Sequence, residues 1–158
     1  MDENYACCFI GHRRILKSST LRERLYDTIE HLITRRGVYR FLFGSKSEFD
    51  ALCLEIVTEL KVKYRHIKRV YVRAEFQNID EEYLEYLLSL YDDTYFPSRL
   101  TNTGRSVYIE RNREMIDESL FCVVYFDESV NYNERKSGTA LAFSYAVRKK
   151  KDIYNMFV

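Results

Sequence analysis

YACCFIG, residues 5–11, is an apolar run that ends in a glycine, and the polar sequence HRR follows it directly. An uninterrupted apolar run of this length is typical of a strand that is buried on both faces of a sheet. VYRFLFG, residues 38–44, repeats the pattern and also ends in a glycine. Strands of this kind occur in parallel sheets covered by helices, so the chain is expected to alternate strands with helices.

Amphipathic patterns between the apolar runs predict the helices. Over residues 20–36 the apolar side chains share one face, Thr20 and Glu23 have capping-box spacing, and Gly37 is the expected C-cap. Further helices are expected around 49–60, 80–93, 105–119 and 137–151, and further strands over 67–74, 120–127 and 152–158, with 75–103 otherwise irregular.

This alternation predicts the fold class. We expect an α/β, Rossmann-like three-layer sandwich with a mostly parallel five-stranded sheet, of order about 3-2-1-4-5, and helices on both faces. The chain has 158 residues, of which 46% are hydrophobic, and is expected to form a single domain over 1–158. Strands 1 and 4 are then neighbours at a topological switch point, where ligands usually bind at the carboxyl ends of the strands.

Composition argues against several classes of protein. The formal net charge is +1, which predicts no broad surface for duplex nucleic acid. No apolar stretch reaches the length of a membrane span, and the acidic N-terminus does not resemble a secretory signal, so a cytoplasmic protein without membrane association is expected. The four cysteines form no C-x-x-C pair, and with three histidines no zinc spacing appears. We therefore expect reduced thiols, no metal and no cofactor.

Polar residues follow the expected strands and start the helices after them, so they should converge at one edge of the sheet. A helix N-terminus presents unpaired amides and a partial positive charge, Gly138 would let an anion approach the backbone, and Thr139 would add a hydroxyl donor. Arginine would add bidentate contacts to phosphate, so the expected ligand is a nucleotide or a phosphoribosyl group. The candidate ligand-binding residues are Gly11, His12, Arg13, Gly44, Ser45, Asp50, Arg111, Asn112, Met115, Asp127, Ser137, Gly138 and Thr139.

Several of these residues also have a structural interpretation. Asp50 could complement a helix dipole, and His12 could be a hydrogen-bonded loop histidine instead of a general base. Tyr108 is expected on the inner face of the helix at 105–119, whereas Arg111 could pair with an acidic residue of that helix, Glu114 or Glu118. Residues 137–139 could serve only as a helix N-cap.

Four segments of the chain together resemble a known family. CCFIGHR, FGSKSEFD, RNREMIDES and KSGTALAFSYAVRKKKDIYN are similar to sequences of the short bacterial SLOG proteins. That superfamily joins the fold of the DNA-processing protein A (DprA) with the Lonely Guy phosphoribohydrolases. The resemblance covers nearly the whole chain and implies a Rossmann-like fold that binds nucleotides or nucleotide-derived ligands.

Two departures from the family pattern bear on function. Arg111 and Met115 keep the spacing of the Lonely Guy enzymes, but the catalytic glutamate of their glycine-rich segment corresponds to Ala142. Cleavage of an N-glycosidic bond needs such a carboxylate, so the sequence favours binding over catalysis. Ser45 and Glu48 replace glycines of the family pattern, and Glu48 would repel a phosphate unless it points away.

The leading hypothesis is a sensor or regulatory protein that binds a nucleotide or a nucleotide-derived, phosphoribosyl or ADP-ribose-like ligand. The first alternative is a nucleoside-monophosphate phosphoribohydrolase or N-glycosidase in which Asp50, Asp127 or Glu128 replaces the missing glutamate. The second alternative is a module with a degenerate pocket that contacts proteins or single-stranded DNA. By analogy with related proteins, a homodimer contact is expected through 105–119 and 75–103.

Overall fold

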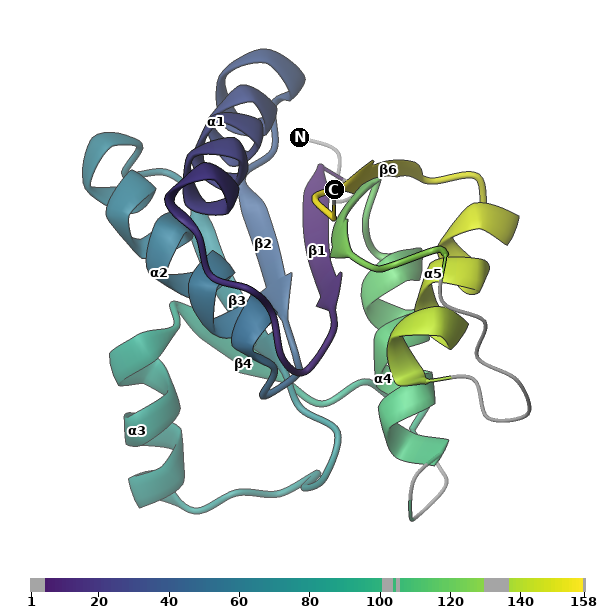
Figure 1. The fold of residues 1–158 in the computed structure, drawn as a ribbon. Coiled ribbons are helices and arrows are strands. Elements are labelled where there is room, and N and C mark those ends of the chain that lie inside the picture. Colours follow the sequence, from purple (N-terminus) through teal and green to yellow (C-terminus); the bar gives the residue numbers. More distant parts are fainter. Residues whose placement is uncertain (1–4, 101–103, 105, 130–136, 158) are drawn as a thin grey trace.

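The computed structural model describes residues 5–100, 104, 106–129 and 137–157. They form a six-stranded, all-parallel sheet in the order β4-β3-β2-β1-β5-β6. Figure 1 shows α1 and α2 on one face of this sheet, and α4 and α5 on the other. In chain order the elements are β1 (Ala6–Gly11), α1 (Ser19–Arg36), β2 (Arg40–Phe43), α2 (Glu48–Lys63), β3 (Lys68–Val72), α3 (Glu81–Leu90), β4 (Asp93–Tyr95), α4 (Ser106–Asp117), β5 (Phe121–Tyr125), α5 (Gly138–Arg148) and β6 (Asp152–Asn155).

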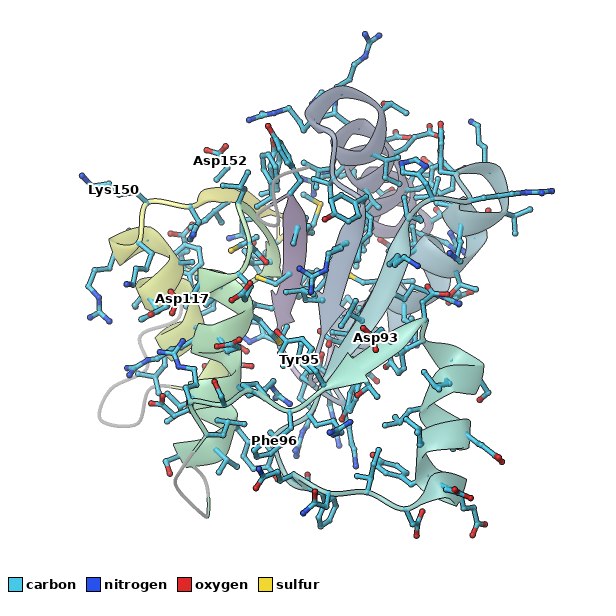
Figure 2. All side chains as sticks on the ribbon, turned by 180° about the vertical axis from the view of Figure 1, so that it is seen from behind. Asp93, Tyr95, Phe96, Asp117, Lys150 and Asp152 are labelled. Atoms are coloured by element: carbon cyan, nitrogen blue, oxygen red, sulfur yellow. The ribbon has the colours of Figure 1, made fainter. Side chains whose placement is uncertain are left out.

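The sheet confirms the predicted fold class and the predicted order of five strands, because β3, β2, β1, β5 and β6 lie side by side as expected. The difference is β4, an edge strand within the segment expected to be irregular, which Figure 2 shows beside α3. β4 has three residues and no apolar run, and Asp92 just before it binds the Arg69 side chain on β3. A strand held by such a distant pair leaves little trace in the local sequence.

The alternation of β1 explains why its sequence is apolar throughout. Cys7 and Phe9 pack in the core beneath α1 and α2, whereas Cys8 and Ile10 pack in the core beneath α4 and α5. All five residues of β5 are buried for the same reason. The two central strands are therefore covered on both faces, as their composition predicts.

Two local predictions about helices were wrong. α1 begins at Ser19, and its N-cap is Ser18, whose hydroxyl oxygen accepts a hydrogen bond from the Leu21 N–H at 3.0 Å. Thr20 therefore lies inside the helix, although Gly37 is the C-cap as expected. On α4, Tyr108 is 40% exposed, because Val107, Arg111 and Met115, spaced four residues apart, form the inner face instead.

Across the described parts of the chain, we find no helix with the length and apolar character needed to span a membrane.

Candidate functional site

A cavity of about 490 Å³ opens at the carboxyl edge of the sheet. Its wall comes from the loops after β1, β2 and β3, the first turns of α3 and α4, and the start of α5. Its volume is in the range of small-molecule sites, about 300–1,000 Å³. The cavity therefore lies at the carboxyl edge, where ligands bind in open α/β sheets, and it extends from the end of β1 and the start of α5 to the loop after β3; none of the described residues of β5 lines it.

The structure brings together nine of the candidate residues on the wall of this cavity: Gly11, Arg13, Gly44, Ser45, Arg111, Asn112, Ser137, Gly138 and Thr139. The other four, His12, Asp50, Met115 and Asp127, are not among the residues that line the cavity. His12, Asp50 and Asp127 make hydrogen bonds that hold loops at this edge, and Met115 packs beside Arg111, as described below.

Gly138 offers an anion the most open approach to the backbone. It is the first residue of α5, after the N-cap Ser137, whose hydroxyl oxygen accepts a hydrogen bond from the Ala140 N–H at 3.0 Å. A Cβ atom at position 138 would have no atom of the described residues within 4 Å. The partial positive charge of the helix N-terminus therefore faces a space that a phosphate group could enter.

The neighbouring Thr139 does not provide the donor that its position suggests. Its Oγ1 donates a hydrogen bond to the carbonyl oxygen of Gly11 at 3.1 Å. This bond ties the start of α5 to the end of β1, and it uses the only hydrogen of the hydroxyl. In this structure the hydroxyl hydrogen of Thr139 is therefore directed to Gly11, and its role toward a ligand stays a prediction.

Arg111 lines the cavity but is almost fully buried, with 4% of its surface exposed. Its Nη1 donates to the carbonyl oxygen of Gly44, and its Nε donates to Asn112 Oδ1 at 3.1 Å. Burial lowers the pKa of Arg111, and the nearby Asp50 carboxylate opposes this shift. Among the described residues, no ion pair joins Arg111 to Glu114 or Glu118, and Glu114 lies 3.7 Å from Arg99. The interpretation of Arg111 as a surface partner of its own helix was therefore wrong.

Gly44 allows this arrangement because a larger residue would occupy the same space as Arg111. A Cβ atom at position 44 would lie 2.6 Å from Arg111 Cδ and 2.8 Å from Met115 Sδ. Met115 is 1% exposed and packs against the arginine from within the core. Gly44 and Met115 therefore shape the site through Arg111.

The carboxylate of Asp50, on α2, holds the loop after β2 by binding its backbone N–H groups. Its Oδ2 accepts hydrogen bonds from the Gly44 N–H at 3.2 Å and the Ser45 N–H at 3.1 Å. Its Oδ1 is buried without a hydrogen-bond partner among the described residues. Burial raises the pKa of Asp50 from its usual 3.8 to about 6, although both backbone bonds and the Arg111 charge lower it. Asp50 therefore positions the loop that binds Arg111.

Three further polar side chains make hydrogen bonds that hold the loops at this edge. His12 Nε2 accepts a hydrogen bond from the Asp127 N–H at 3.1 Å, and burial lowers the pKa of His12 against the effect of the Asp127 carboxylate. Asp127 Oδ1 accepts hydrogen bonds from the Ser129 N–H and hydroxyl at 3.0 and 2.6 Å. Glu48 Oε1 accepts from the Ile15 N–H at 2.9 Å, so its charge is directed to the loop after β1.

The sequence did not reveal the part of the cavity wall that comes from β3, its loop, and α3. β3 is followed by polar residues in the same way as β1 and β2, and that signal could have added this loop to the predicted site. The missed lining residues are Phe9, Ile10, Lys46, Ser47, Tyr71, Arg73, Ala74, Glu75, Phe76, Tyr83 and Tyr108.

The charge of the lining favours an anionic ligand. Four cationic side chains, Arg13, Lys46, Arg73 and Arg111, and one carboxylate, Glu75, belong to the described wall. The N-terminus of α5 adds a partial positive charge. Within a cavity partly lined by protein, these charges attract phosphate more strongly than they would in bulk water.

Fold and cavity define a Rossmann-like α/β protein with an open site at the carboxyl edge of a parallel sheet. A scan against protein-family models and a search of the curated proteins found no match to this chain. Within the described residues, no group of three or more His, Cys, Asp or Glu side chains could hold a metal ion. The four cysteines are buried and free.

Proposed function

We propose that this protein binds a nucleotide or a nucleotide-derived ligand at the carboxyl edge of its sheet, and that it acts as a sensor or regulatory protein. The main support for this proposal is that Gly138, at the N-terminus of α5, and the buried Arg111 line the same cavity. Backbone amides, a guanidinium and further cations are the groups that bind phosphate in proteins. The motifs that resemble SLOG proteins support the same ligand class by analogy.

Binding is favoured over glycosidic cleavage by the positions of the carboxylates. Ala142 is buried in the core against β1 and α4, so the chain has no acidic side chain where the Lonely Guy enzymes have theirs. Asp50, Asp127 and Glu128, which were candidates to replace it, do not line the cavity. The one carboxylate among the described lining residues is Glu75, whose Oε1 accepts a hydrogen bond from the Tyr108 hydroxyl at 2.8 Å. An absence of free base after incubation with nucleoside 5′-monophosphates is therefore expected, measured by chromatography.

The test compares the wild-type protein with Gly138→Ala. The added methyl group meets no described protein atom, and alanine favours a helix, so the variant should fold normally. The same methyl group would occupy the space through which a phosphate reaches the backbone. Calorimetric titration with 5′-AMP, 5′-GMP, 5′-CMP, 5′-UMP and ADP-ribose should show binding by wild type, and at least tenfold weaker binding by Gly138→Ala.

Ser144→Ala is the matched control, because Ser144 is exposed on α5 and does not line the cavity. Its nucleotide affinity should equal that of the wild type. A wild-type protein that binds none of these nucleotides would overturn the proposal, as would a Gly138→Ala variant that binds as tightly as wild type.

A further inference from the structure

The side of the cavity next to β3 and α3 differs in chemistry from the side next to α5. Four aromatic side chains line it: Tyr71 on β3, Phe76 in the following loop, Tyr83 on α3 and Tyr108 on α4. Phe76 is 57% exposed and Tyr108 is 40% exposed, which leaves large aromatic surfaces open to solvent. Aromatic faces of this kind stack on the rings of nucleobases.

The loop that carries Phe76 is held in place by Arg73. Arg73 Nε donates to the carbonyl oxygen of Phe76 at 3.3 Å, and its Nη2 donates to that of Gln77 at 3.2 Å. Its Nη1 donates to Thr94 Oγ1 on β4 at 3.4 Å. The edge strand and the loop are thus joined, so this wall is formed before any ligand arrives.

Glu75 supplies the only carboxylate among the described lining residues, and it lies on this aromatic side. Its Oε1 accepts a hydrogen bond from the Tyr108 hydroxyl at 2.8 Å, which fixes the direction of the side chain. That hydrogen bond raises the pKa of Tyr108, so the tyrosine stays protonated and remains a donor. A carboxylate accepts several hydrogen bonds and repels phosphate.

The two sides lie at a suitable separation for one ligand. β2 lies between β1 and β3, so the ends of β1 and β3 are roughly 10 Å apart at the usual strand spacing. A nucleoside monophosphate spans a comparable distance from phosphate to base. Away from the aromatic side, Arg13, Lys46 and the α5 N-terminus favour the phosphate. On the aromatic side, Glu75 repels phosphate and offsets the charge of Arg73, whose guanidinium already donates to the Phe76 and Gln77 carbonyl oxygens, so the charges favour one orientation.

We infer that the aromatic side, formed by Tyr71, Phe76, Tyr83 and Tyr108 with Glu75, is a nucleobase subsite that selects guanine. This inference rests on the proposed function. A carboxylate pairs best with two adjacent N–H donors, and guanine presents N1–H beside its 2-amino group. Adenine presents an acceptor, N1, beside its amino group, and uracil presents carbonyl oxygens on both sides of its N–H, so both bases fit this carboxylate less well.

Calorimetric titration with 5′-GMP, 5′-AMP and 5′-UMP tests the inference on wild type and Glu75→Gln. Wild type should bind 5′-GMP at least tenfold more tightly than 5′-AMP or 5′-UMP. Glu75→Gln should lose most of this preference while its affinity for 5′-AMP changes less than threefold. Glu81→Gln is the control, because it removes the same charge from a residue that is exposed at the start of α3 and does not line the cavity.

The outcomes separate this inference from the proposed function. If the three nucleotides bind with similar affinity, or if Glu75→Gln keeps the preference for 5′-GMP, the guanine subsite is wrong and nucleotide binding stands. If no nucleotide binds, both are wrong. Tyr108→Phe adds a second readout, because it removes only the hydroxyl that orients Glu75, and it should weaken 5′-GMP binding by a smaller factor than Glu75→Gln does.

Discussion

Arg111 lies against Gly44 so closely that position 44 has no room for a side chain. The guanidinium donates to the Gly44 carbonyl oxygen, and a Cβ atom there would lie 2.6 Å from Arg111 Cδ. Asp50 binds the N–H of the same glycine from the other side. Gly44, which directly follows β2, thus binds the buried Arg111 through its carbonyl oxygen and the buried Asp50 through its N–H.

Gly44→Ala should destabilise the protein by about 1–3 kcal/mol, because the methyl group forces Arg111 and Met115 out of their packed positions. The measurement is the free energy of unfolding from urea denaturation. Gly138→Ala is the matched comparison, since its methyl group meets no described atom, and it should change stability by less than about 0.5 kcal/mol. Equal stability of the two variants would contradict the packing described for Gly44.

Asp50 should make stability depend on pH in an unusual direction. Its pKa is about 6 in the folded protein and 3.8 ordinarily, so the folded state holds the proton more tightly. The contribution of Asp50 to the free energy of unfolding is therefore complete below pH about 4, and it is lost as the pH rises through about 6. The full difference is about 3 kcal/mol, at about 1.4 kcal/mol for each pKa unit.

Asp50→Asn isolates this effect from the other titrating groups. The free energy of unfolding of wild type minus that of Asp50→Asn should fall between pH 4 and pH 7, as measured by urea denaturation at each pH. A difference that stays constant, or that rises with pH, would show that Asp50 is not held in the buried environment described here.

Asp92 should matter for the edge strand β4. It accepts hydrogen bonds from Arg69 Nε, Nη2 and backbone N–H at 3.0, 3.2 and 2.8 Å, which lower its pKa despite the opposing effect of burial. Asp92→Asn should cost about 1.5–3 kcal/mol of stability, the range for hydrogen bonds to charged groups. Hydrogen exchange should show faster exchange at the Arg73 N–H, which donates to Tyr95 on β4.

Glu85→Gln serves as the control for Asp92→Asn, because it removes the same charge from an exposed position on α3. It should leave both stability and exchange at Arg73 unchanged. If the two variants behaved alike, the Arg69–Asp92 pair would not be what holds β4 to the sheet.

Thr139→Val should separate stability from binding. The variant loses the hydrogen bond to the Gly11 carbonyl oxygen, so its free energy of unfolding should be about 1 kcal/mol lower than that of the wild type. Since that hydroxyl is already used within the protein, nucleotide affinity should change less than threefold. A large loss of affinity without a loss of stability would show that Thr139 contacts the ligand directly.

The strands and helices whose signals lie within one contiguous stretch of sequence could be predicted. The apolar runs of β1, β2 and β5 are long enough to indicate buried strands, and the helices between them carry apolar residues at helical spacing. β4 could not be predicted, because its three residues are placed by the Arg69–Asp92 pair, which joins positions 23 residues apart in the sequence. The predicted Thr20 cap failed because Ser18, two residues earlier, was equally suited to cap α1.

The candidate site could be predicted in part, because parallel strands deliver the loops after them to one edge. That rule found Gly11, Gly44 and Gly138 but could not assign their roles. A Cβ at Gly11 would lie 2.3 Å from Phe49 Cδ2, so packing requires that glycine, whereas Gly138 has open space. Nor could the sequence show that Arg111 is buried, since only the fold places β2 beneath α4.

A crystal structure of the protein with saturating 5′-GMP tests the central claim most directly. The account predicts a phosphate group within hydrogen-bond distance of the Gly138 N–H and near Arg111, with the base stacked on the aromatic side beside Glu75. A nucleotide whose phosphate lies elsewhere on the protein, or a cavity that stays without nucleotide at saturating concentration, would contradict it.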